Sequence, residues 1–343
     1  MTASATQRSI RSIMKYPQRG DKLNIFTFTT HERYESNLCK TGHNFYTINL
    51  PNQKTWDTDY APIPDNYTIL DVIPEYLDFD IILSHTSCER LQIAHNIISE
   101  TNLGTLDKLA IPILRHTHVL PDVRMNVEQQ IKNFQSIPVD TNSFISKFNM
   151  NAWGYNESNA SFVPHGVDTD FWRPEPAEKQ NLCLSVVNDW PNRDWCCGFE
   201  LWKKTIDGLP AMVVGKSPGF SEPARSTEHL RSIYQNSRIF YNTSLHSPVP
   251  TVMLEAMACG CAIVSTDNCM IPEVIQHGYN GLISNDPDQL RSYLESLLSN
   301  EQLAKELGEN ARKTIEEKYN LDLFCESWNE LLYSTIEKYK GKA

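Results

Sequence analysis

One stretch of the chain joins a proline-rich loop, a short apolar helix that carries one carboxylate, and a buried strand. It runs from His246 to Ile283 and reads HSPVPTVMLEAMACGCAIVSTDNCMIPEVIQHGYNGLI. Thr251 is expected to cap the helix, because its hydroxyl can accept a hydrogen bond from a free backbone N–H of the first turn. Gly260 is expected to end the helix. The N–H groups at a helix N-terminus bind anions, so the stretch predicts an anion site.

The apolar run Ala262–Ser265 follows this glycine and predicts a short buried strand. Loop, helix N-terminus and strand then meet at one edge of a parallel sheet, which is where open α/β sheets bind nucleotides. Glu255 lies inside the helix. Its carboxylate could accept hydrogen bonds from two sugar hydroxyls at once. The alternative is a structural glutamate that interacts with the helix dipole.

This stretch resembles the donor-binding signature of the GT-B glycosyltransferases, in particular the retaining GT4-like family (glycosyl transferases group 1). The resemblance rests on LEAMACG, on the strand CAIVST, on PEVI at 272–275 and on HGYNGLI at 277–283. The family has two glutamates separated by seven residues. Glu255 matches the second, whereas Ser247 stands where the family usually has the first. The resemblance implies that Glu255 binds the donor ribose and that Ser247 bonds a sugar hydroxyl without supplying charge.

The same resemblance implies further donor contacts. Pro250, Thr251 and Val252 lie at the helix start, where backbone N–H groups are expected to bind phosphate. In the family an arginine and a lysine of an earlier loop bind the donor diphosphate, and here that loop offers Arg193. A guanidinium can bind a diphosphate through two hydrogen bonds, and a solvated loop arginine is the alternative. Lys216, in the next loop, is a second phosphate candidate.

The first half of the chain places a histidine after an apolar strand. The run LAIPIL at 109–114 predicts that strand, and Arg115, His116, Thr117 and His118 follow it. The resemblance implies that His118 contacts the sugar or acceptor, which makes His118 and Glu255 the candidate catalytic residues. A hydrogen-bonded structural histidine is the alternative. His116 is expected on the opposite face of the strand, and Arg115 is expected as a surface charge.

The elements that must position these residues alternate between strand and helix, which predicts an α/β fold. Strands are expected at 23–29, 45–50, 79–83, 109–114, 141–146, 182–187, 211–214, 238–242 and 262–265. Helices are expected at 31–40, 69–76, 89–99, 127–134, 148–155 and 229–235, with two amphipathic helices after residue 300. The resemblance implies the GT-B architecture, in which two Rossmann-like domains face each other across a cleft and the last helix crosses back to the N-domain.

The expected domain limits follow this reading. Residues 1–22 form a basic tail that is expected to be disordered, with a helix lying on a membrane as the alternative. An acceptor domain covers 23–174, a nucleotide-sugar domain covers 180–320, and the returning helix covers 321–343. The N-domain departs from the family pattern after its first strand, where residues 29–33 (TTHER) lack the usual glycines.

Composition narrows the classes of function. The 343 residues are enough for two domains, and the net charge of −11 argues against nucleic acid as a partner. No run approaches the ~20 apolar residues of a membrane span. Nine irregularly spaced cysteines, without a signal peptide, indicate reduced thiols and a cytoplasmic protein. The acidic pair Asp168 and Asp170 is expected to form a turn and a cap. The resemblance implies that no metal takes part, because GT-B enzymes bind their donor without such a metal pair, and no other cofactor is expected.

The resemblance implies a hexosyltransferase-type enzyme that moves a sugar from a nucleotide-sugar donor to a glycan, protein or lipid-linked acceptor. The resemblance implies retention of the anomeric configuration. A catalytically silent GT-B protein that binds a sugar nucleotide or glycan is the alternative, because Ser247 replaces a glutamate. A sugar-nucleotide epimerase is a third reading. An NAD-dependent oxidoreductase is not expected, because no GxGxxG follows any predicted strand.

Overall fold

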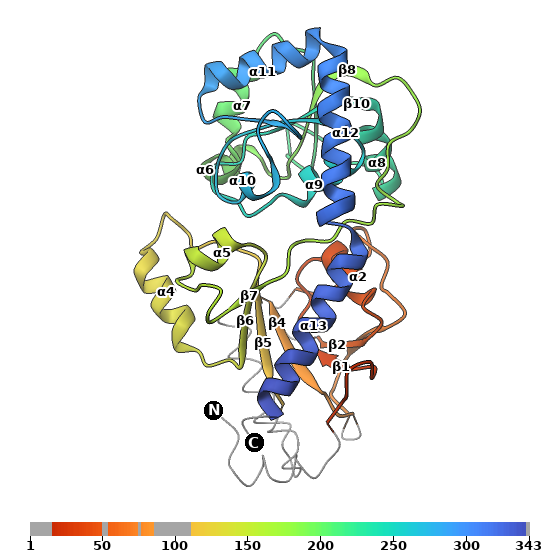
Figure 1. Ribbon diagram of the computed structural model, residues 1–343, viewed down its shortest axis with the longest axis vertical. Coiled ribbons are helices and arrows are strands. Elements are labelled where there is room, and N and C mark those ends of the chain that lie inside the picture. The colour runs from red at the N-terminus through yellow and green to blue at the C-terminus, as the bar shows by residue number, and fades with distance from the viewer. Residues whose placement is uncertain (1–15, 50–53, 75–76, 86–110, 341–343) are drawn as a thin grey trace. The chain divides into compact units, whose positions relative to one another are not determined.

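The computed structural model describes residues 16–49, 54–74, 77–85 and 111–340 (Figure 1). The chain divides into two compact units. Unit 1 is Met1–Pro164 together with Phe324–Ala343, and unit 2 is His165–Leu323. Residues 165–174, expected in the first domain, belong to unit 2. Most of the N-terminal tail and the helix expected at 89–99 lie outside the described residues.

Unit 1 is built on a parallel sheet whose seven described strands have the order β3-β2-β1-β4-β5-β6-β7. The strands are β1 (Asn24–Phe26), β2 (Asn44–Ile48), β3 (Tyr67–Leu70), β4 (Ile81–His85), β5 (Ile113–Thr117), β6 (Thr141–Phe144) and β7 (Ser161–Phe162). The order runs outward from β1 in both directions, so the connections diverge between β1 and β4. That divergence is the topological switch point of a doubly wound sheet.

The strand β3 corrects one prediction. A helix is expected from 69 to 76, but residues 67–70 form a strand that pairs in parallel with β2. The sequence Tyr-Thr-Ile-Leu is rich in aromatic and β-branched side chains, which pack well on a pleated sheet. The run is only four residues long and is flanked by prolines and aspartates, so its strand pattern is weak over the length of sequence needed to recognise a helix.

The described helices of unit 1 are α2 (Glu32–Cys39), α4 (Val127–Ser136), α5 (Lys147–Ala152) and most of α13 (Leu321–Lys340). Asn126 and Ser146 cap α4 and α5, because each side-chain oxygen accepts a backbone N–H three residues later. The twenty-residue α13 packs on the sheet of unit 1 (Figure 1), where the Trp328 ring lies 4.8 Å from the His116 ring. The last helix therefore returns to the N-terminal sheet, as predicted.

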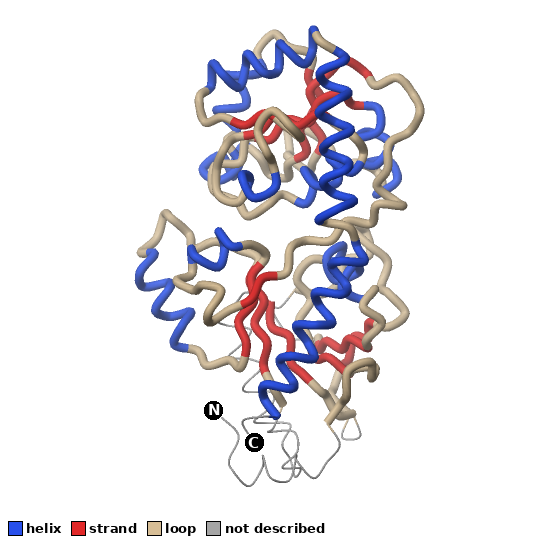
Figure 2. The backbone as a smooth tube through the Cα atoms, in the orientation of Figure 1, coloured by secondary structure: helices blue, strands red, loops and turns tan. Residues whose placement is uncertain are grey.

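Unit 2 contains a second parallel sheet, of five strands in the order β12-β11-β10-β8-β9. The strands are β8 (Gln180–Val186), β9 (Ala211–Val214), β10 (Ser237–Asn242), β11 (Ala262–Ser265) and β12 (Leu282–Ile283). Helices surround this sheet (Figure 2): η2 (Pro191–Arg193), α6 (Asp194–Cys197), α7 (Phe199–Ile206), α8 (Thr227–Asn236), α9 (Thr251–Ala258), α10 (Ile271–Val274), α11 (Pro287–Ser299) and α12 (Glu301–Lys318). The predicted strands at 211–214 and 262–265 match β9 and β11 residue for residue.

The helix α11 is not among the predicted elements. Its start carries a recognisable signal, because Asp286 is the N-cap and Pro287 is the first helical residue. The Asp286 side chain accepts the backbone N–H groups of Asp288 and Gln289. The other acidic pair acts in a similar way, since Asp168 Oδ1 accepts the N–H groups of Asp170 and Phe171. The expected turn role of Asp168 is therefore confirmed.

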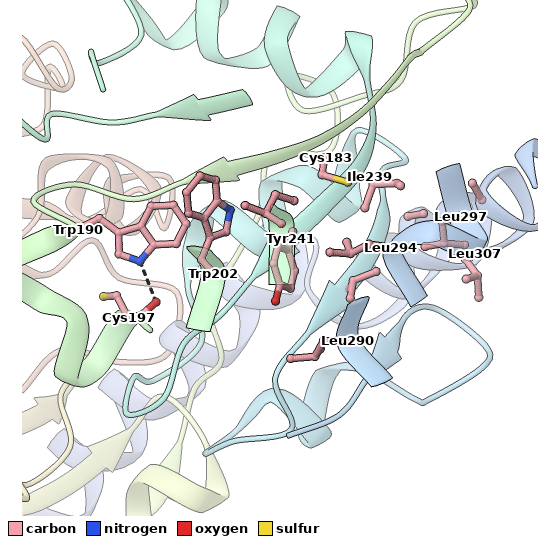
Figure 3. Packing of buried hydrophobic residues seen from close by; sticks show 14 of the residues in the cluster. Cys183, Trp190, Cys197, Trp202, Ile239, Tyr241, Leu290, Leu294, Leu297 and Leu307 are labelled. Carbon is pink, nitrogen blue, oxygen red and sulfur yellow. Dashed lines mark hydrogen bonds between the residues drawn. The ribbon is translucent and has the colours of Figure 1, made fainter. Parts of the chain in front are cut away.

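The core of unit 2 is formed by aromatic and aliphatic side chains from several elements (Figure 3). Trp190 and Tyr241 belong to it, together with leucines of α11 and α12. Trp190 is fully buried, and its indole Nε1–H donates to the backbone carbonyl of Cys197 over 2.9 Å. This bond fixes the loop that follows β8 against the helix that comes after it.

Candidate active site

The sheet order of unit 2 marks where a ligand would bind. From β8 the chain first adds β9 on one side, and then β10, β11 and β12 on the other. The connections therefore diverge between β8 and β10, and the loops that leave the carboxyl ends of these two strands border the switch point. Ligands of open α/β sheets bind in the crevice outside the strands' carboxyl ends at such a point. The two loops are residues 187–193 and 243–250.

The segment after β8 holds the loop after β10 in place. The Cys196 carbonyl accepts the backbone N–H groups of Leu245, over 2.9 Å, and His246, over 3.1 Å. The Cys197 carbonyl accepts the Thr243 hydroxyl over 2.9 Å. Three hydrogen bonds thus fix the entry to the proline-rich loop. The described cysteines, including the adjacent Cys196 and Cys197, are free thiols.

Asn188 links the segments that carry Arg193 and Lys216. The Asn188 side-chain oxygen accepts the Lys216 backbone N–H over 2.8 Å, and the Asn188 carbonyl lies 3.4 Å from Arg193 Nη1. Asp189 donates its N–H to the Lys216 carbonyl over 2.8 Å, which joins the two loops a second time. Both cationic side chains are exposed. Asn188 is absent from the predicted site, although its position just after a buried strand was a usable signal.

The start of α9 differs from the prediction. Pro250 is the N-cap, with φ −66° and ψ 120°, and no side chain caps the helix. Thr251 is the first helical residue, so its expected capping role is wrong. The cause is the proline, whose ring fixes φ and takes the last extended position before the helix. The N–H groups of Thr251 and Val252 therefore begin a helix that has no side-chain cap.

The end of α9 follows the prediction. Gly260 has φ 72°, a left-handed conformation that suits glycine. Its N–H donates to the Met257 carbonyl over 2.9 Å, and the Cys261 N–H donates to the Ala256 carbonyl over 3.0 Å. These two bonds form the Schellman motif, which satisfies the last carbonyls of the helix.

Glu255 is buried on α9, with 6% of its surface exposed. The Tyr234 hydroxyl, from α8, donates to Glu255 Oε2 over 3.3 Å. A buried carboxylate needs several polar partners, so this position suits a group that accepts more than one hydroxyl. Ser247 is half-buried, and its hydroxyl donates to the Pro248 carbonyl over 2.8 Å. The Ser247 hydroxyl therefore donates its hydrogen bond within its own loop.

In unit 1, His118 follows β5 and is half-buried. Its Nε2 lies 2.9 Å from Nδ1 of the fully buried His85. The Tyr34 ring stands edge-on to the His118 ring, with centroids 4.4 Å apart. His118 is thus fixed on two sides at the carboxyl end of its strand, where parallel sheets place functional residues.

The expectation that His116 lies on the opposite face from His118 is wrong. Their ring centroids are 4.7 Å apart, because side chains two residues apart along a strand share a face. His116 is fully buried, with Nε2 3.2 Å from the Tyr34 hydroxyl and Nδ1 3.1 Å from the Ser143 hydroxyl. Burial raises the pKa of Tyr34 well above its usual value, so this hydroxyl keeps its proton.

The expectation that Arg115 is a surface charge is also wrong, because only 1% of its surface is exposed. It lies on the other face of β5. Its guanidinium donates to the Asn142 side chain over 2.8 Å and to the Phe134 carbonyl over 2.6 Å, and stands 3.5 Å above the Phe134 ring. The last turn of α4 leaves carbonyls that a buried arginine can satisfy. Arg115 is therefore a structural residue between β5 and α4.

Residues 223–314 match the family Glycosyl transferases group 1. This confirms the resemblance noted on the residues from 246 to 283. The matched segment contains Ser247, Pro250, Thr251, Val252 and Glu255, all predicted as donor-binding residues. The group 1 segment begins after Arg193 and Lys216 and excludes His118.

Characterised relatives align over part of the chain. Alpha-maltose-1-phosphate synthase of Mycolicibacterium smegmatis is 31% identical over 122 residues, which is 33% of this chain and 30% of that protein. N-acetyl-alpha-D-glucosaminyl L-malate synthase of Bacillus anthracis is 33% identical over 160 residues, covering 46% of this chain and 39% of that protein. The chain thus spans less than half the length of these relatives.

A solved structure extends the comparison to nearly the whole chain. HepE from Anabaena, crystallised in complex with UDP, superposes with a TM-score of 0.69 at 12% identity, covering 92% of this chain and 100% of HepE. At this identity the likeness shows the fold alone. The predicted α/β fold class, GT-B, is therefore confirmed.

Two further observations concern the described residues only. Within the described ranges, no three histidine, cysteine, aspartate or glutamate side chains gather in a way that could hold a metal ion. In the same part of the chain, no helix combines the length and the apolar composition needed to cross a bilayer.

Proposed function

We propose that the protein is a hexosyltransferase that transfers a sugar from a nucleotide-sugar donor to an acceptor, with retention at the anomeric carbon. The main support is the start of α9, which has no side-chain cap. It follows the loop at the switch point between β8 and β10, and it lies in the segment that matches the group 1 family. A helix N-terminus at a switch point favours a phosphate-bearing ligand. The match to the family Glycosyl transferases group 1 and the likeness to an alpha-maltose-1-phosphate synthase and an N-acetyl-alpha-D-glucosaminyl L-malate synthase support a nucleotide sugar as that ligand.

In this proposal, the residues of the candidate donor site bind different parts of the donor. The N–H groups of Thr251 and Val252 bind the diphosphate, with Arg193 and Lys216 neutralising the charge that develops as the sugar leaves. Pro250 shapes the loop into α9. Glu255 accepts the ribose hydroxyls from its buried position. Charge stabilisation on this scheme comes from the helix and two cations, so we propose that no metal or other cofactor takes part.

On the acceptor side, His118 contacts the sugar or the incoming hydroxyl. The half-buried position of its ring at the carboxyl end of β5 supports this role. The acceptor is a glycan, a protein or a lipid-linked molecule, and nucleic acid is not a substrate because the chain carries a net charge of −11. We also propose a cytoplasmic location, where nucleotide sugars are available.

A thermal-shift screen with UDP-, GDP-, ADP- and dTDP-sugars tests the donor class. A ligand that binds the native state alone stabilises it, by about 2.7 kcal/mol at a concentration of 100 times Kd. We expect the melting temperature to rise with one base, and the rise to be lost in Glu255→Ala. Product analysis with that donor and candidate acceptors then tests transfer. If none of the donors shifts the melting temperature and none is consumed, the proposal is wrong.

A catalytically silent, sugar-nucleotide-binding protein is the second candidate. The observation that favours it is Ser247, which stands in place of a glutamate and bonds its own loop at Pro248. Such a protein would show the thermal shift without turnover. Slow donor hydrolysis, or any transfer product, rules this candidate out.

A further inference from the structure

Two aromatic rings meet where the loops at the switch point of unit 2 come together. Trp195 lies on the short helix α6, two residues after Arg193, and His246 lies in the loop after β10, directly before Ser247. The two ring centroids are 6.0 Å apart and the ring planes are inclined by 37°. This distance is within the usual range for aromatic side chains that pack together. The ring pair therefore joins the segment after β8 to the proline-rich loop.

The backbone holds the two rings in place. The Cys196 carbonyl accepts the N–H groups of Leu245 and His246 over 2.9 and 3.1 Å. Gly198 ends α6 with φ 64°, and a Cβ at Gly198 would stand 2.2 Å from the Thr243 carbonyl oxygen. The two segments are thus in direct backbone contact next to the rings, so the position of each ring depends on both segments.

The ring pair offers an apolar surface beside polar groups. Trp195 and His246 are both half-buried. Part of the Trp195 side chain packs against the core cluster that contains Trp190 and Tyr241, which anchors the ring. Ligand pockets present fixed aromatic surfaces of this kind to the apolar part of a ligand. A hexose has such a part, because the C–H bonds of its ring form an apolar face between the hydroxyls.

The proposed donor site leads the sugar towards this ring pair. Glu255, assigned to the ribose, comes four residues after Thr251 and therefore lies about 6 Å further along α9. The diphosphate is assigned to the start of the helix. His246 precedes that start, in the loop that enters the helix. The order of ribose, diphosphate and sugar then runs from Glu255 through the helix start to the ring pair.

Ser247 supports an apolar contact at this end of the donor. It stands where the family usually has a glutamate, and its hydroxyl donates to the Pro248 carbonyl over 2.8 Å. The loop therefore presents no carboxylate to the sugar at Ser247. Stacking on an aromatic ring contributes binding energy without charge, and the neighbouring Trp195 has the larger ring of the pair.

We propose that Trp195 is a donor-binding residue whose ring stacks on the apolar face of the transferred hexose, with His246 packed beside it. The inference rests on the proposed transferase function, because both concern the same donor. A nucleoside diphosphate has no hexose to stack on the ring. Trp195 therefore contributes to the affinity for a sugar nucleotide and not to the affinity for its nucleoside diphosphate.

Isothermal titration with matched ligands tests this difference. The pairs are UDP-glucose with UDP, GDP-mannose with GDP, ADP-glucose with ADP, and dTDP-glucose with dTDP. For each protein we compare the Kd of the nucleoside diphosphate with the Kd of the sugar nucleotide. In Trp195→Leu we expect the ratio of the two to fall roughly threefold to tenfold, which is the usual contribution of an aromatic contact. The Kd of the nucleoside diphosphate should not change, and Trp195→Phe, which keeps a ring, should regain most of the ratio.

Tyr279→Ala is the matched control. It removes another exposed aromatic side chain of unit 2, outside the two loops of the switch point. We expect this variant to keep the wild-type ratio. An unchanged ratio in Trp195→Leu overturns the proposal. So does an equal loss of affinity for both ligands of a pair that Trp195→Phe restores, because the ring would then contact the nucleotide.

Fluorine NMR of the protein labelled with 5-fluorotryptophan gives a second measurement on the wild type itself. The Trp195 resonance is assigned by its absence in Trp195→Phe. We expect the sugar nucleotide to shift this resonance and the nucleoside diphosphate to shift it much less. Equal shifts with the two ligands contradict the proposal, and this result does not depend on the folding of Trp195→Leu.

The same measurements separate this inference from the proposed function. A wild type that binds the donor and yields no transfer product contradicts the transferase function, while the affinity ratio still decides the role of Trp195. A wild type that transfers sugar, with an unchanged ratio in Trp195→Leu, keeps the transferase function and overturns the inference. A wild type that binds none of these ligands contradicts both.

Discussion

Glu255 is the residue on which the donor assignment depends most. Its carboxylate is buried and accepts the Tyr234 hydroxyl over 3.3 Å. Glu255→Gln keeps the shape but loses the charge and one acceptor oxygen. Since a hydrogen bond to a charged group contributes about 1.5–3 kcal/mol, donor affinity should fall roughly tenfold to a hundredfold. Isothermal titration with the donor found in the thermal screen measures this.

Tyr234→Phe is the control for that substitution. It removes the hydroxyl that Glu255 accepts and leaves the carboxylate itself in place. Donor affinity is expected to change little in Tyr234→Phe. If both variants bind the donor as the wild type does, Glu255 is a structural residue and the ribose assignment is wrong.

His43 makes the stability of unit 1 sensitive to acid. Burial lowers the pKa of His43 below its usual value, and Lys22 adds to this, while the Asn329 side chain opposes it. Its Nδ1 accepts the Leu23 backbone N–H over 3.2 Å. Protonation would end that bond and place a charge in the core. The neutral ring is therefore the form that the folded state requires.

The sign of the effect follows from that lowered pKa. The unfolded chain binds a proton at His43 near pH 6.5, where the folded protein does not. The contribution of neutral His43 to the free energy of unfolding is then fully present above that pH. It falls as the pH drops below it, by at most about 1.4 kcal/mol per pH unit. Urea unfolding at pH 8 and pH 5.5 measures the loss. His43→Asn, which keeps an acceptor oxygen, should lose less stability than the wild type between these pH values, and an equal loss contradicts the assignment.

The sequence predicted the candidate site residues better than it predicted which side chains are buried and what they contact. The histidine after β5 and the glutamate in α9 are both recognisable from their neighbours. Arg115 is not, because nothing in the sequence shows that the last carbonyls of α4 and the Phe134 ring will surround its guanidinium. Nor does the sequence show that His85, at the end of β4, lies 2.9 Å from His118 after β5, because this contact depends on the strand order.

At the scale of elements, the strands and helices with strong patterns were predictable, and some of their boundaries were predictable too. Gly260 ends α9 as expected, because a left-handed residue after a helix is a local requirement. The start of α9 is one residue earlier than Thr251 suggests, since Pro250 competes for the cap. The strand β3 and the helix α11 were missed. The first is four residues long, whereas the second was predictable from its buried leucines at helical spacing, Leu290, Leu294 and Leu297.

The loop after β9 gives a prediction at this scale. Gly215 has φ 143°, and a Cβ there would stand 2.0 Å from the Val187 carbonyl oxygen. Gly215→Ala should therefore displace the loops that carry Asn188 and Lys216 and cost about 3 kcal/mol or more. In the same loop Gly219 has φ 77° with open space around its Cβ position. Gly219→Ala should cost only about 1 kcal/mol, for backbone strain.

Chemical denaturation of both glycine variants measures the two costs, and a donor titration follows the site. We expect Gly215→Ala to weaken donor binding, since Lys216 and Asn188 lose their register, while Gly219→Ala binds nearly as the wild type does. Equal stability losses in the two variants would contradict the close approach between Gly215 and Val187.

At the scale of the whole molecule, the chain builds two units from two sheets and returns its last helix to the first unit. Each unit has its own buried clusters, with Trp190 in a cluster of unit 2 and Phe134 and Phe26 in clusters of unit 1. The alternation of strands and helices predicted an α/β fold, and the family resemblance implied two such sheets. The division of the chain was less predictable, because the residues 165–174 that follow Pro164 resemble neither a linker nor a regular element.

The return of α13 gives the last prediction. Trp328 is fully buried in unit 1, and its ring lies 4.8 Å from the His116 ring. Trp328→Ala would leave a cavity and is expected to destabilise unit 1 by about 3–5 kcal/mol. Because Trp328 belongs to unit 1, and the described core cluster that contains Trp190 and Tyr241 in unit 2 includes no residue of α13, hydrogen exchange should become faster in β5 and β6 while β10 and β11 keep their protection. Ser327→Ala, exposed on the same helix, should change stability by less than about 0.5 kcal/mol. Equal loss of protection in both sheets would contradict the prediction that Trp328 stabilises unit 1 separately from unit 2.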